Sequence, residues 1–498
     1  MSSATVSVTT ILIIVAIGAA IGFLAGVHRK MNLEQWTVGG RGFGVVLVFL
    51  LMAGEVYTTF AFLGASGWAY SRGGPALYVL AYITLAYVVS FFILPQIWEM
   101  GRKHGMQTVS DFFSVRYGNR YLAGFVCVVG IACFVPYVQL QLTGVGIIVS
   151  VASFDGIGRT PAMAIAVALL IAFVFASGVR AVAWVSVVKD VLMVFAALTI
   201  GIGIPLIRFG GIGPMFAALA HARPAHMTMP GATHNLGHAW FISTVLLTSL
   251  GFYMWPHGFA ATFTAKSADT LRRNAVIMPL YTLTLVFIFF AGFAAVLLVP
   301  GLANGDLAML TVVRESFPPW FLGVVGGAGA LTAMVPASIF ILTAATLFAK
   351  NLYRPVFAPA MTDDQVAKLA RSMVIVVGLI SLYLAINSST TIVSLLLTGY
   401  AGVTQFFPGV VLGLYWKRVT AAAVFCGMIA GVAAAVFLML SHRDPLFGLS
   451  AGFLALCLNF LITVFGSLLT PAPGEQRTKT LDVGAEITPR TMRSGATS

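Results

Sequence analysis

Charged residues are scarce in this chain. Only 9% of its 498 residues are Asp, Glu, Lys or Arg, whereas ordinary soluble proteins carry about 25%. Hydrophobic residues make up 59%, and the mean hydropathy is +0.98. A composition this poor in charge over the whole length excludes a soluble globular protein and indicates an all-α bundle of membrane-spanning helices.

Catalytic motifs are also missing. The sequence has no H-E-x-x-H, no suitably placed G-x-S-x-G, no P-loop and no cluster of acids for a metal, so we predict no enzyme activity and no cofactor. Charges in the apolar segments are too few to line a channel pore. The four cysteines lack metal-ligand spacing and are interpreted as small core residues: Cys127, Cys133, Cys426 and Cys457.

Apolar runs long enough to cross a bilayer recur along the chain. We predict about thirteen spans, at residues 8–28, 43–69, 76–98, 121–152, 161–177, 183–207, 239–262, 274–300, 318–349, 372–387, 391–415, 419–441 and 447–470. The first run has no basic segment before it and is interpreted as a retained span, not a signal peptide. Residues 1–470 therefore form one transmembrane domain, followed by a polar tail, 471–498, that we expect to be disordered and cytoplasmic.

Basic residues are placed asymmetrically between the loops. The net charge of +13 does not indicate nucleic-acid binding, because most lysines and arginines fall in the loops of one side. The loops of the other side hold only Arg72, Arg159, Arg208, Arg223, Arg314 and Arg443. This asymmetry predicts an outside N-terminus and an inside C-terminus, in the cytoplasmic (inner) membrane of a bacterium. We expect the protein to lie in the lipid bilayer, and we infer no obligate protein partner.

Three charged residues lie inside predicted spans. Glu55 stands in the stretch Met52 to Phe60, and Lys189 and Asp190 stand together in a later span. Such residues are costly in lipid and mark functional sites by default. Consecutive helical residues point about 100° apart, so we expect one of Lys189 and Asp190 to pair with Glu55, or Asp190 to lie near the cytoplasmic end. A permanent Glu55–Lys189 ion pair with a purely structural role is the alternative.

The outer loop 208–238 is rich in histidine. Its members are His221, His226, His234 and His238. Their spacing fits no closed zinc site, so we interpret the segment as an ordinary extracellular loop and predict no metal site.

Several motifs resemble those of the sodium:solute symporter family. They are Trp36–Arg41 (WTVGGR), Thr108–Gly118 (TVSDFFSVRYG), Gly251–His257 (GFYMWPH) with Ala265–Ser267 (AKS), Gln405 with Pro408, and Trp416–Arg418 (WKR). The resemblance implies the leucine-transporter architecture: two inverted repeats of five helices, here about 43–207 and 239–415, with one extra N-terminal and two extra C-terminal helices. It also implies secondary active transport by alternating access.

The first helix of each repeat is interrupted in such folds, and the exposed backbone binds substrate and ion. Gly54 lies in the first core helix, and Gly251 and Pro256 lie in the sixth. Proline removes a backbone donor and clashes with the preceding turn, so this helix must bend or open there. The two interruptions occupy corresponding places in the repeats.

The expected sodium ligands are only partly present. The resemblance assigns sodium to carbonyls of Gly54 and Tyr57 and to two hydroxyl residues on the eighth core helix, where this chain has Val335 and Pro336. Lys189 stands where the family often has glutamine. We therefore predict proton coupling through Glu55, Lys189 or both, because a buried lysine or glutamate can titrate near neutral pH. The alternative is sodium held by Thr332, Ser338 and backbone carbonyls.

The motifs MVPAS and VKD look most like those of the monocarboxylate permease branch. We therefore expect a short acid such as lactate, pyruvate or acetate, with a sodium-coupled symporter of proline, alanine or pantothenate as the alternative. Hydroxyl and amide donors and half-helix ends suit a carboxylate. The predicted substrate site comprises Glu55, Tyr57, Thr58, Thr59, Tyr137, Gln139, Gln141, Tyr253, Trp255, His257, Tyr400 and Gln405.

Overall fold

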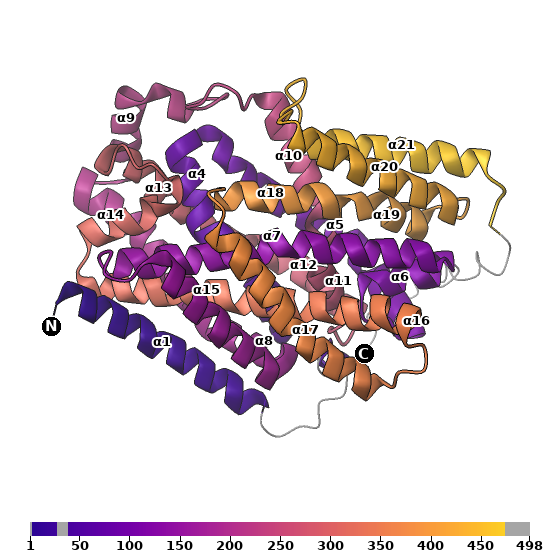
Figure 1. Cartoon of the computed structure of the whole chain (residues 1–498). Coiled ribbons are helices and arrows are strands. Elements are labelled where there is room, and N and C mark those ends of the chain that lie inside the picture. Colours follow the sequence, from indigo (N-terminus) through magenta and orange to yellow (C-terminus); the bar gives the residue numbers. More distant parts are fainter. Residues whose placement is uncertain (1, 27–37, 474–498) are drawn as a thin grey trace, which may run out of the picture.

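The computed structural model describes residues 2–26 and 38–473, without the side chains of residues 25–26 and 175–181. In the described part the chain is helical, and the only bridges are two isolated ones, Phe43 with Ala265 and Leu446 with Leu449. Figure 1 shows the long helices packed side by side in one bundle. The predicted all-α class is confirmed. The first two residues of the Trp36–Arg41 motif, and the predicted tail from residue 474 on, lie outside the described residues.

The predicted spans correspond to helices of sufficient length and apolar character. Within the described residues, ten helices can each cross a membrane, and one bent pair makes an eleventh. The remaining predicted spans, 161–177 and 239–262, correspond to the shorter apolar helices Arg159–Val174 and His238–Met254. The chain is a multi-pass membrane protein.

The first predicted repeat contains the helices α3 (Val45–Val56), α4 (Ala65–Arg72), α5 (Tyr78–His104), α7 (Arg120–Ala152) and α8 (Arg159–Phe209). The last of these, α8, covers both the fourth and the fifth predicted core spans. The second repeat contains α10 (His238–Gly251), α11 (Pro256–Thr262), α12 (Ala268–Thr282), α13 (Leu285–Leu298), α15 (Pro319–Thr346), α17 (Asp363–Ile386), α18 (Ile392–Val403) and α19 (Phe407–Tyr415). Among the spans of the described residues, Pro319–Phe357, which contains α15, is the most enclosed. In it, 89% of an apolar stretch of 18 residues is buried.

The additional helices lie at both ends of the chain. At the N-terminus, α1 (Ser3–Gly26) packs against α8 and α15, while α20 (Ala421–Leu440) and α21 (Ala451–Leu469) pack against each other. Figure 1 shows α1 and the α20–α21 pair on opposite sides of the bundle.

The first core helix breaks after Val56. Its two halves, Val45–Val56 and Phe60–Arg72, are bent by 52°, and Tyr57 leaves the helical region with φ −84° and ψ 89°. The chain then continues through the π-helix η2 (Phe60–Gly64) into α4. Gly54, which suggested the interruption, is itself helical and lies three residues before the break.

The sixth core helix breaks at the predicted proline. After α10 the chain forms the 3-10 turn η5 (Phe252–Met254), and Trp255 adopts φ −56° and ψ 129°. Pro256 then occupies the first position of α11, where its missing N–H costs nothing and its fixed φ suits a helix start. The local chemistry of proline therefore explains why the new helix begins here.

The Thr108–Gly118 motif forms the short helix α6 (Val109–Tyr117) between α5 and α7. Thr108 and Asp111 make a reciprocal capping box, and Gly118 ends the helix in the left-handed region at φ 58°. The Asp111 carboxylate also accepts hydrogen bonds from Lys350 Nζ at 2.7 Å and Asn351 Nδ2 at 2.8 Å, both in η7 (Leu347–Tyr353). The motif thus fixes α6 to the end of α15.

Candidate functional site

Lys189 lies at the break of the first core helix. Its side chain is fully buried, and Nζ donates to the carbonyl oxygens of Gly54 and Tyr57, each at 3.1 Å. The last carbonyls of a helix have no intrahelical partner. An ammonium group therefore lies at the two backbone oxygens that the family resemblance assigned to sodium.

Asp190 provides the counter-charge. Its Oδ1 lies 3.0 Å from Lys189 Nζ and accepts a hydrogen bond from the Tyr281 hydroxyl at 3.0 Å. We expected one member of this consecutive pair to meet Glu55, but the two side chains meet each other. The flexible four-carbon stem of Lys189 overcomes the 100° divergence of the two Cα–Cβ bonds.

Gly54 allows the close approach of α8. A Cβ built on Gly54 would lie 2.9 Å from Ser186 Oγ and 3.7 Å from Lys189 Nζ. A larger residue would require Ser186 or the helix itself to shift, so the absence of a side chain here helps to bring Lys189 within reach of the backbone. This role differs from the predicted one of a helix-weakening residue.

Tyr57 contributes its backbone, not its side chain. The phenol hydroxyl is hydrogen-bonded to Thr284 Oγ1, and the ring packs edge-on against Tyr281 with centroids 5.1 Å apart. The side chain therefore points toward the α12–α13 segment. The break after Val56 takes the side chain out of the helical register, so these contacts do not bring it to the other predicted substrate-site residues.

An aromatic cluster joins α7, the second break and α15. The Tyr137 ring lies 4.6 Å from that of Trp255 and 4.0 Å from that of Phe340. Tyr400 of α18 packs edge-on against Trp255 at 5.6 Å. Three predicted site residues thus meet, and Phe340 joins them although no sequence signal distinguished it from the other phenylalanines.

Glu55 and His257 face each other across the two breaks. Glu55 Oε2 lies 3.8 Å from His257 Nε2, and both residues are buried, at 6% and 4% exposure. The imidazole packs against the Phe340 ring at 4.5 Å. In the described part of the chain the ion pair of Lys189 is with Asp190, and the close Glu55–Lys189 pair of the structural alternative is not present.

The predicted threonine and glutamine residues near the first break differ in their contacts. Gln141 Oε1 accepts hydrogen bonds from the backbone N–H of Thr59 at 3.1 Å and from its Oγ1 at 2.6 Å, so Gln141 holds the first break in place. Thr58 is buried near Tyr137. Gln139 is also buried, but two residues along α7 from both Tyr137 and Gln141 it lies on a different face of the helix.

Gln405 and Tyr253 lie outside the aromatic cluster. Gln405 Nε2 donates to Ala401 O at 3.0 Å, and its Oε1 accepts from Asn459 Nδ2 of α21 at 3.1 Å. Gln405 therefore joins α18 to the C-terminal helices, so its predicted place in the substrate site is not supported by these contacts. Tyr253 packs against Phe252 at 4.9 Å and approaches Gly258 at the start of α11.

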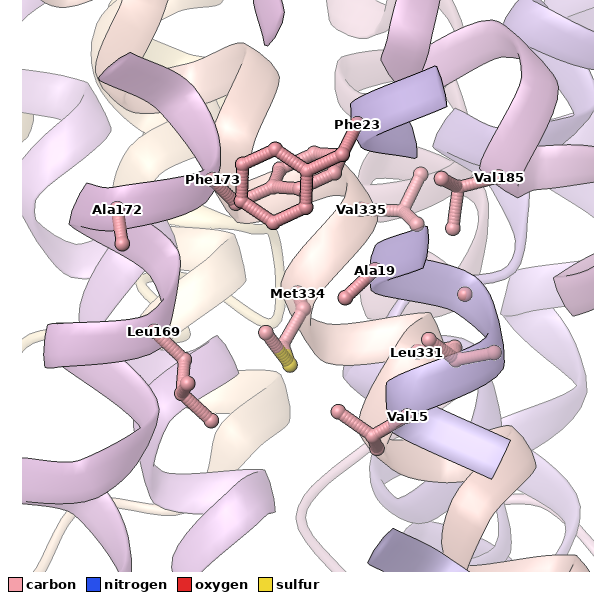
Figure 2. A pocket seen from close by; sticks show the side chains of 11 residues that line it. Val15, Ala19, Phe23, Leu169, Ala172, Phe173, Val185, Leu331, Met334 and Val335 are labelled. Carbon is pink, nitrogen blue, oxygen red and sulfur yellow. The ribbon is translucent and has the colours of Figure 1, made fainter. Parts of the chain in front are cut away.

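The eighth core helix presents no hydroxyl pair at the expected sodium position. Val335 lines an apolar cavity of about 150 Å³ between α1, α8 and α15 (Figure 2). Ser338 Oγ donates to Met334 O at 2.7 Å within its own helix. Thr332 Oγ1 is buried and has no hydrogen-bond partner among the described residues.

The histidine-rich outer loop forms α9 (Ile212–Ala222) and a 3-10 turn, η4 (Pro224–Met227). His226 Nε2 is hydrogen-bonded to Tyr70 O at 3.0 Å. Across the residues that the structure describes, no three His, Cys, Asp or Glu side chains are grouped so that they could hold a metal ion.

The chain is similar to known symporters along most of its length. The family model described as "Sodium:solute symporter family" matches residues 36–431. The "Uncharacterized symporter YhjB" of Bacillus subtilis is 46% identical over 90% of this chain and 94% of its own length. The "Monocarboxylate transport permease protein" of Rhizobium johnstonii is 27% identical over 92% of this chain and 95% of its own.

Solved structures show the same fold. A Na⁺-coupled sialic acid symporter in a substrate-bound, outward-open state superposes with a TM-score of 0.79 at 17% identity, covering 94% of this chain and 98% of the other. The nucleobase-cation-symport-1 family transporter Mhp1 gives 0.57 at 13% identity, covering 91% and 99%. The predicted leucine-transporter-type architecture is confirmed by these neighbours.

Proposed function

Because the chain belongs to the sodium:solute symporter family and is a secondary active transporter of a solute with a cation, we propose that it imports a short monocarboxylate together with protons. The solute is an acid of the size of lactate, pyruvate or acetate. Import proceeds by alternating access across the inner membrane of a bacterium, with the N-terminus outside and the C-terminus inside.

The contact of Lys189 with the broken helix supports the choice of ion. Its Nζ donates to Gly54 O and Tyr57 O, so the charged amine holds the end of α3 against α8. Loss of the proton would remove the charge that the two carbonyls and Asp190 stabilise, and would weaken the attachment of α3 to α8. Of the two sequence candidates for the proton site, Lys189 is favoured, because Glu55 contacts α11 and not the free carbonyls.

The donor set does not fit sodium at this position. A hard cation needs several oxygens to replace its hydration shell, and Lys189 Nζ already uses both carbonyls. Val335 and Pro336 supply no side-chain oxygen. Sodium coupling remains the second candidate on two observations: the family match itself, and the buried hydroxyl of Thr332, which has no hydrogen-bond partner among the described residues.

The permease from Rhizobium johnstonii supports a monocarboxylate. The aromatic cluster around Tyr137, Trp255 and Phe340 also suits a small solute. Its walls are mostly rings, and a small solute needs only a few polar partners. Other relatives carry the names of proline and pantothenate transporters at 25% and 22% identity, so these solutes belong in the same test.

Uptake into proteoliposomes tests the proposal. A panel of short monocarboxylates, pantothenate, proline and alanine is offered with a proton-only or a sodium-only gradient. We expect accumulation of a monocarboxylate with the proton gradient, and its loss when that gradient is dissipated. Accumulation with sodium alone would refute the ion assignment, and accumulation of only the other solutes would refute the substrate class.

The Lys189→Gln variant tests the coupling residue. It is expected to exchange substrate between the two sides while failing to accumulate it against a gradient. Glu55→Gln, compared in parallel, is expected to retain accumulation driven by protons. The reverse pattern would assign the coupling proton to Glu55.

A further inference from the structure

Glu55 and His257 form a polar pair that the coupling mechanism does not use. Glu55 belongs to the last turn of α3 and His257 to the first turn of α11, so the pair connects the two interrupted helices. The 3.8 Å between Oε2 and Nε2 exceeds a hydrogen bond. A Cβ at Gly258 would lie 3.6 Å from Glu55 Oε2, so the carboxylate rests against the start of α11.

Both partners have atoms without a hydrogen bond. Among the described residues, Glu55 Oε1, His257 Nδ1 and Trp255 Nε1 are buried and have no partner. Buried polar groups in native proteins are almost always paired, and the exceptions indicate a ligand or a functional role. Three such atoms lie at the two facing breaks, where substrate binds in this fold, and point to contact with the transported solute.

The walls around the pair are apolar rings. Phe340, Phe134, Tyr137 and Trp255 lie 4.5, 5.6, 5.8 and 5.9 Å from the imidazole. Among the described residues, the imidazole's charged neighbour is Glu55. Trp255 Nε1 can only donate, an ionised Glu55 can only accept, and the imidazole can do either.

A simple carboxylate cannot satisfy this set while Glu55 is ionised. Its oxygens accept from Trp255 Nε1 and from the imidazole, but they offer no donor to the ionised Glu55. A hydroxyl on the neighbouring carbon donates to Glu55 Oε1 and accepts from His257. We infer that the Glu55–His257 pair selects solutes whose carboxylate carries a hydrogen-bond donor on the 2-carbon, as in a 2-hydroxy monocarboxylate. This inference rests on the proposed function, since it takes a short acid as the solute.

Four acids with the same three-carbon skeleton test the inference. They are lactate, with a hydroxyl donor on carbon 2, alanine, with an ammonium donor, pyruvate, with an acceptor only, and propionate, with neither. Binding to the purified full-length chain is measured as ligand-induced thermal stabilisation, which needs no ion gradient. We expect lactate to bind about 10- to 100-fold more tightly than propionate and pyruvate, the factor for leaving one buried polar group unpaired.

The variants separate recognition from packing. His257→Phe keeps a ring against Phe340 but removes both nitrogens, so the ratio of lactate to propionate affinity is expected to fall to within about threefold. Phe340→Leu alters the same wall without changing a polar atom, and should shift the affinities of all four acids by a common factor. His257→Gln restores a polar side chain and should recover part of the ratio.

The outcomes distinguish this inference from the proposed function. Propionate binding as tightly as lactate overturns the role of the pair but leaves a monocarboxylate transporter. If alanine binds and lactate does not, the role of the pair stands and the assignment of the solute to the monocarboxylates is overturned. Binding of none of the four acids overturns both.

Discussion

The ammonium of Lys189 lies 3.0 Å from the carboxylate of Asp190, its neighbour in sequence, and both side chains are buried. Burying two charges is costly, and their attraction compensates for this only when both are present. The pair therefore makes a specific contribution to folding that is separate from the proposed transport of protons.

Removing one member of this pair should destabilise the protein more than removing both. Lys189→Met or Asp190→Asn alone is expected to cost about 3–5 kcal/mol, because each leaves an uncompensated buried charge. The double variant, which leaves neither charge unpaired, should lose less than either single variant. The measurement is the midpoint of thermal unfolding in detergent, with Ser66→Ala, whose hydroxyl bonds only carbonyls of the preceding turn among the described residues, as the control. Additive losses would show that the two charges do not interact.

Gly54 should not tolerate a methyl group. In Gly54→Ala the new Cβ would meet Ser186 Oγ at 2.9 Å, so Ser186 or α3 must shift, which disturbs the contact of α3 with Lys189. We expect a loss of about 1–3 kcal/mol together with impaired uptake. Gly124 of α7 is the matched control, because a Cβ there meets nothing within 4 Å. Gly124→Ala should gain up to about 1 kcal/mol from helix propensity. Equal effects of the two substitutions would contradict the close approach at Gly54.

The Asp111–Lys350 contact should matter for stability at neutral pH. Burial alone would raise the pKa of the Asp111 carboxyl, but the Lys350 ammonium and the hydrogen bonds from Gln107 and Asn351 outweigh it, so the pKa is lowered. Because the pKa of Asp111 is lower in the folded chain, its stabilising contacts are fully present above pH 3.8, the pKa of Asp111 in the unfolded chain. They are lost as the pH falls through the pKa of the folded chain. Asp111→Asn is therefore expected to cost about 1–3 kcal/mol at pH 7, and to lose the fall in stability that the wild type shows below about pH 4.

The matched control for Asp111 is an exposed ion pair. Asp269 Oδ2 lies 2.7 Å from Arg273 Nε, with side chains 61% and 67% exposed. Because solvent screens such pairs, Asp269→Asn should change stability by less than about 0.5 kcal/mol. Thermal unfolding at several pH values measures both variants. A loss at Asp269 as large as that at Asp111 would show that burial of the Asp111 contact is unimportant.

Much of the fold was predictable because lipid restricts the choices. A chain that must satisfy every backbone group internally forms helices, and their number follows from the apolar runs. Pro256 marked the second break because proline chemistry is local. The first break falls at Tyr57, three residues after the glycine that suggested it. Gly54 is explained by its close contact with Ser186 and not by helix weakening.

The site was predictable only where a residue stood out by type. Lys189 was recognisable because charge is rare in a span. Phe340 is one of 38 phenylalanines, and nothing in the sequence distinguishes it. Gln405 was assigned to the substrate site from its motif, but its partner Asn459 is 54 residues away, and such long-range contacts leave no local pattern. The orientation of Tyr57 could not be inferred either, because helical periodicity does not apply across a break.

Asp306 should make stability depend on pH in the opposite direction to Asp111. It lies in the 3-10 turn η6 (Gly305–Leu307), between two spans, and its Oδ2 accepts the Ile392 N–H at 3.1 Å at the start of α18. Burial raises the pKa of Asp306 to about 6, although the Ile392 bond and Arg159 oppose the rise. Because the folded pKa exceeds the unfolded value of 3.8, the stabilisation is fully present below about pH 4 and is lost as the pH rises through about 6.

The wild type should therefore gain up to about 3 kcal/mol from Asp306 when the pH falls from 7 to 4. Asp306→Asn keeps an acceptor for Ile392 but cannot titrate, so it should be at least as stable as the wild type at pH 7 and lose this gain. Thermal unfolding of both proteins across this pH range measures the difference between their pH profiles, which removes the contribution of every other group. Parallel profiles would mean that Asp306 titrates alike in the folded and unfolded chain, and that its bond to α18 does not depend on its charge.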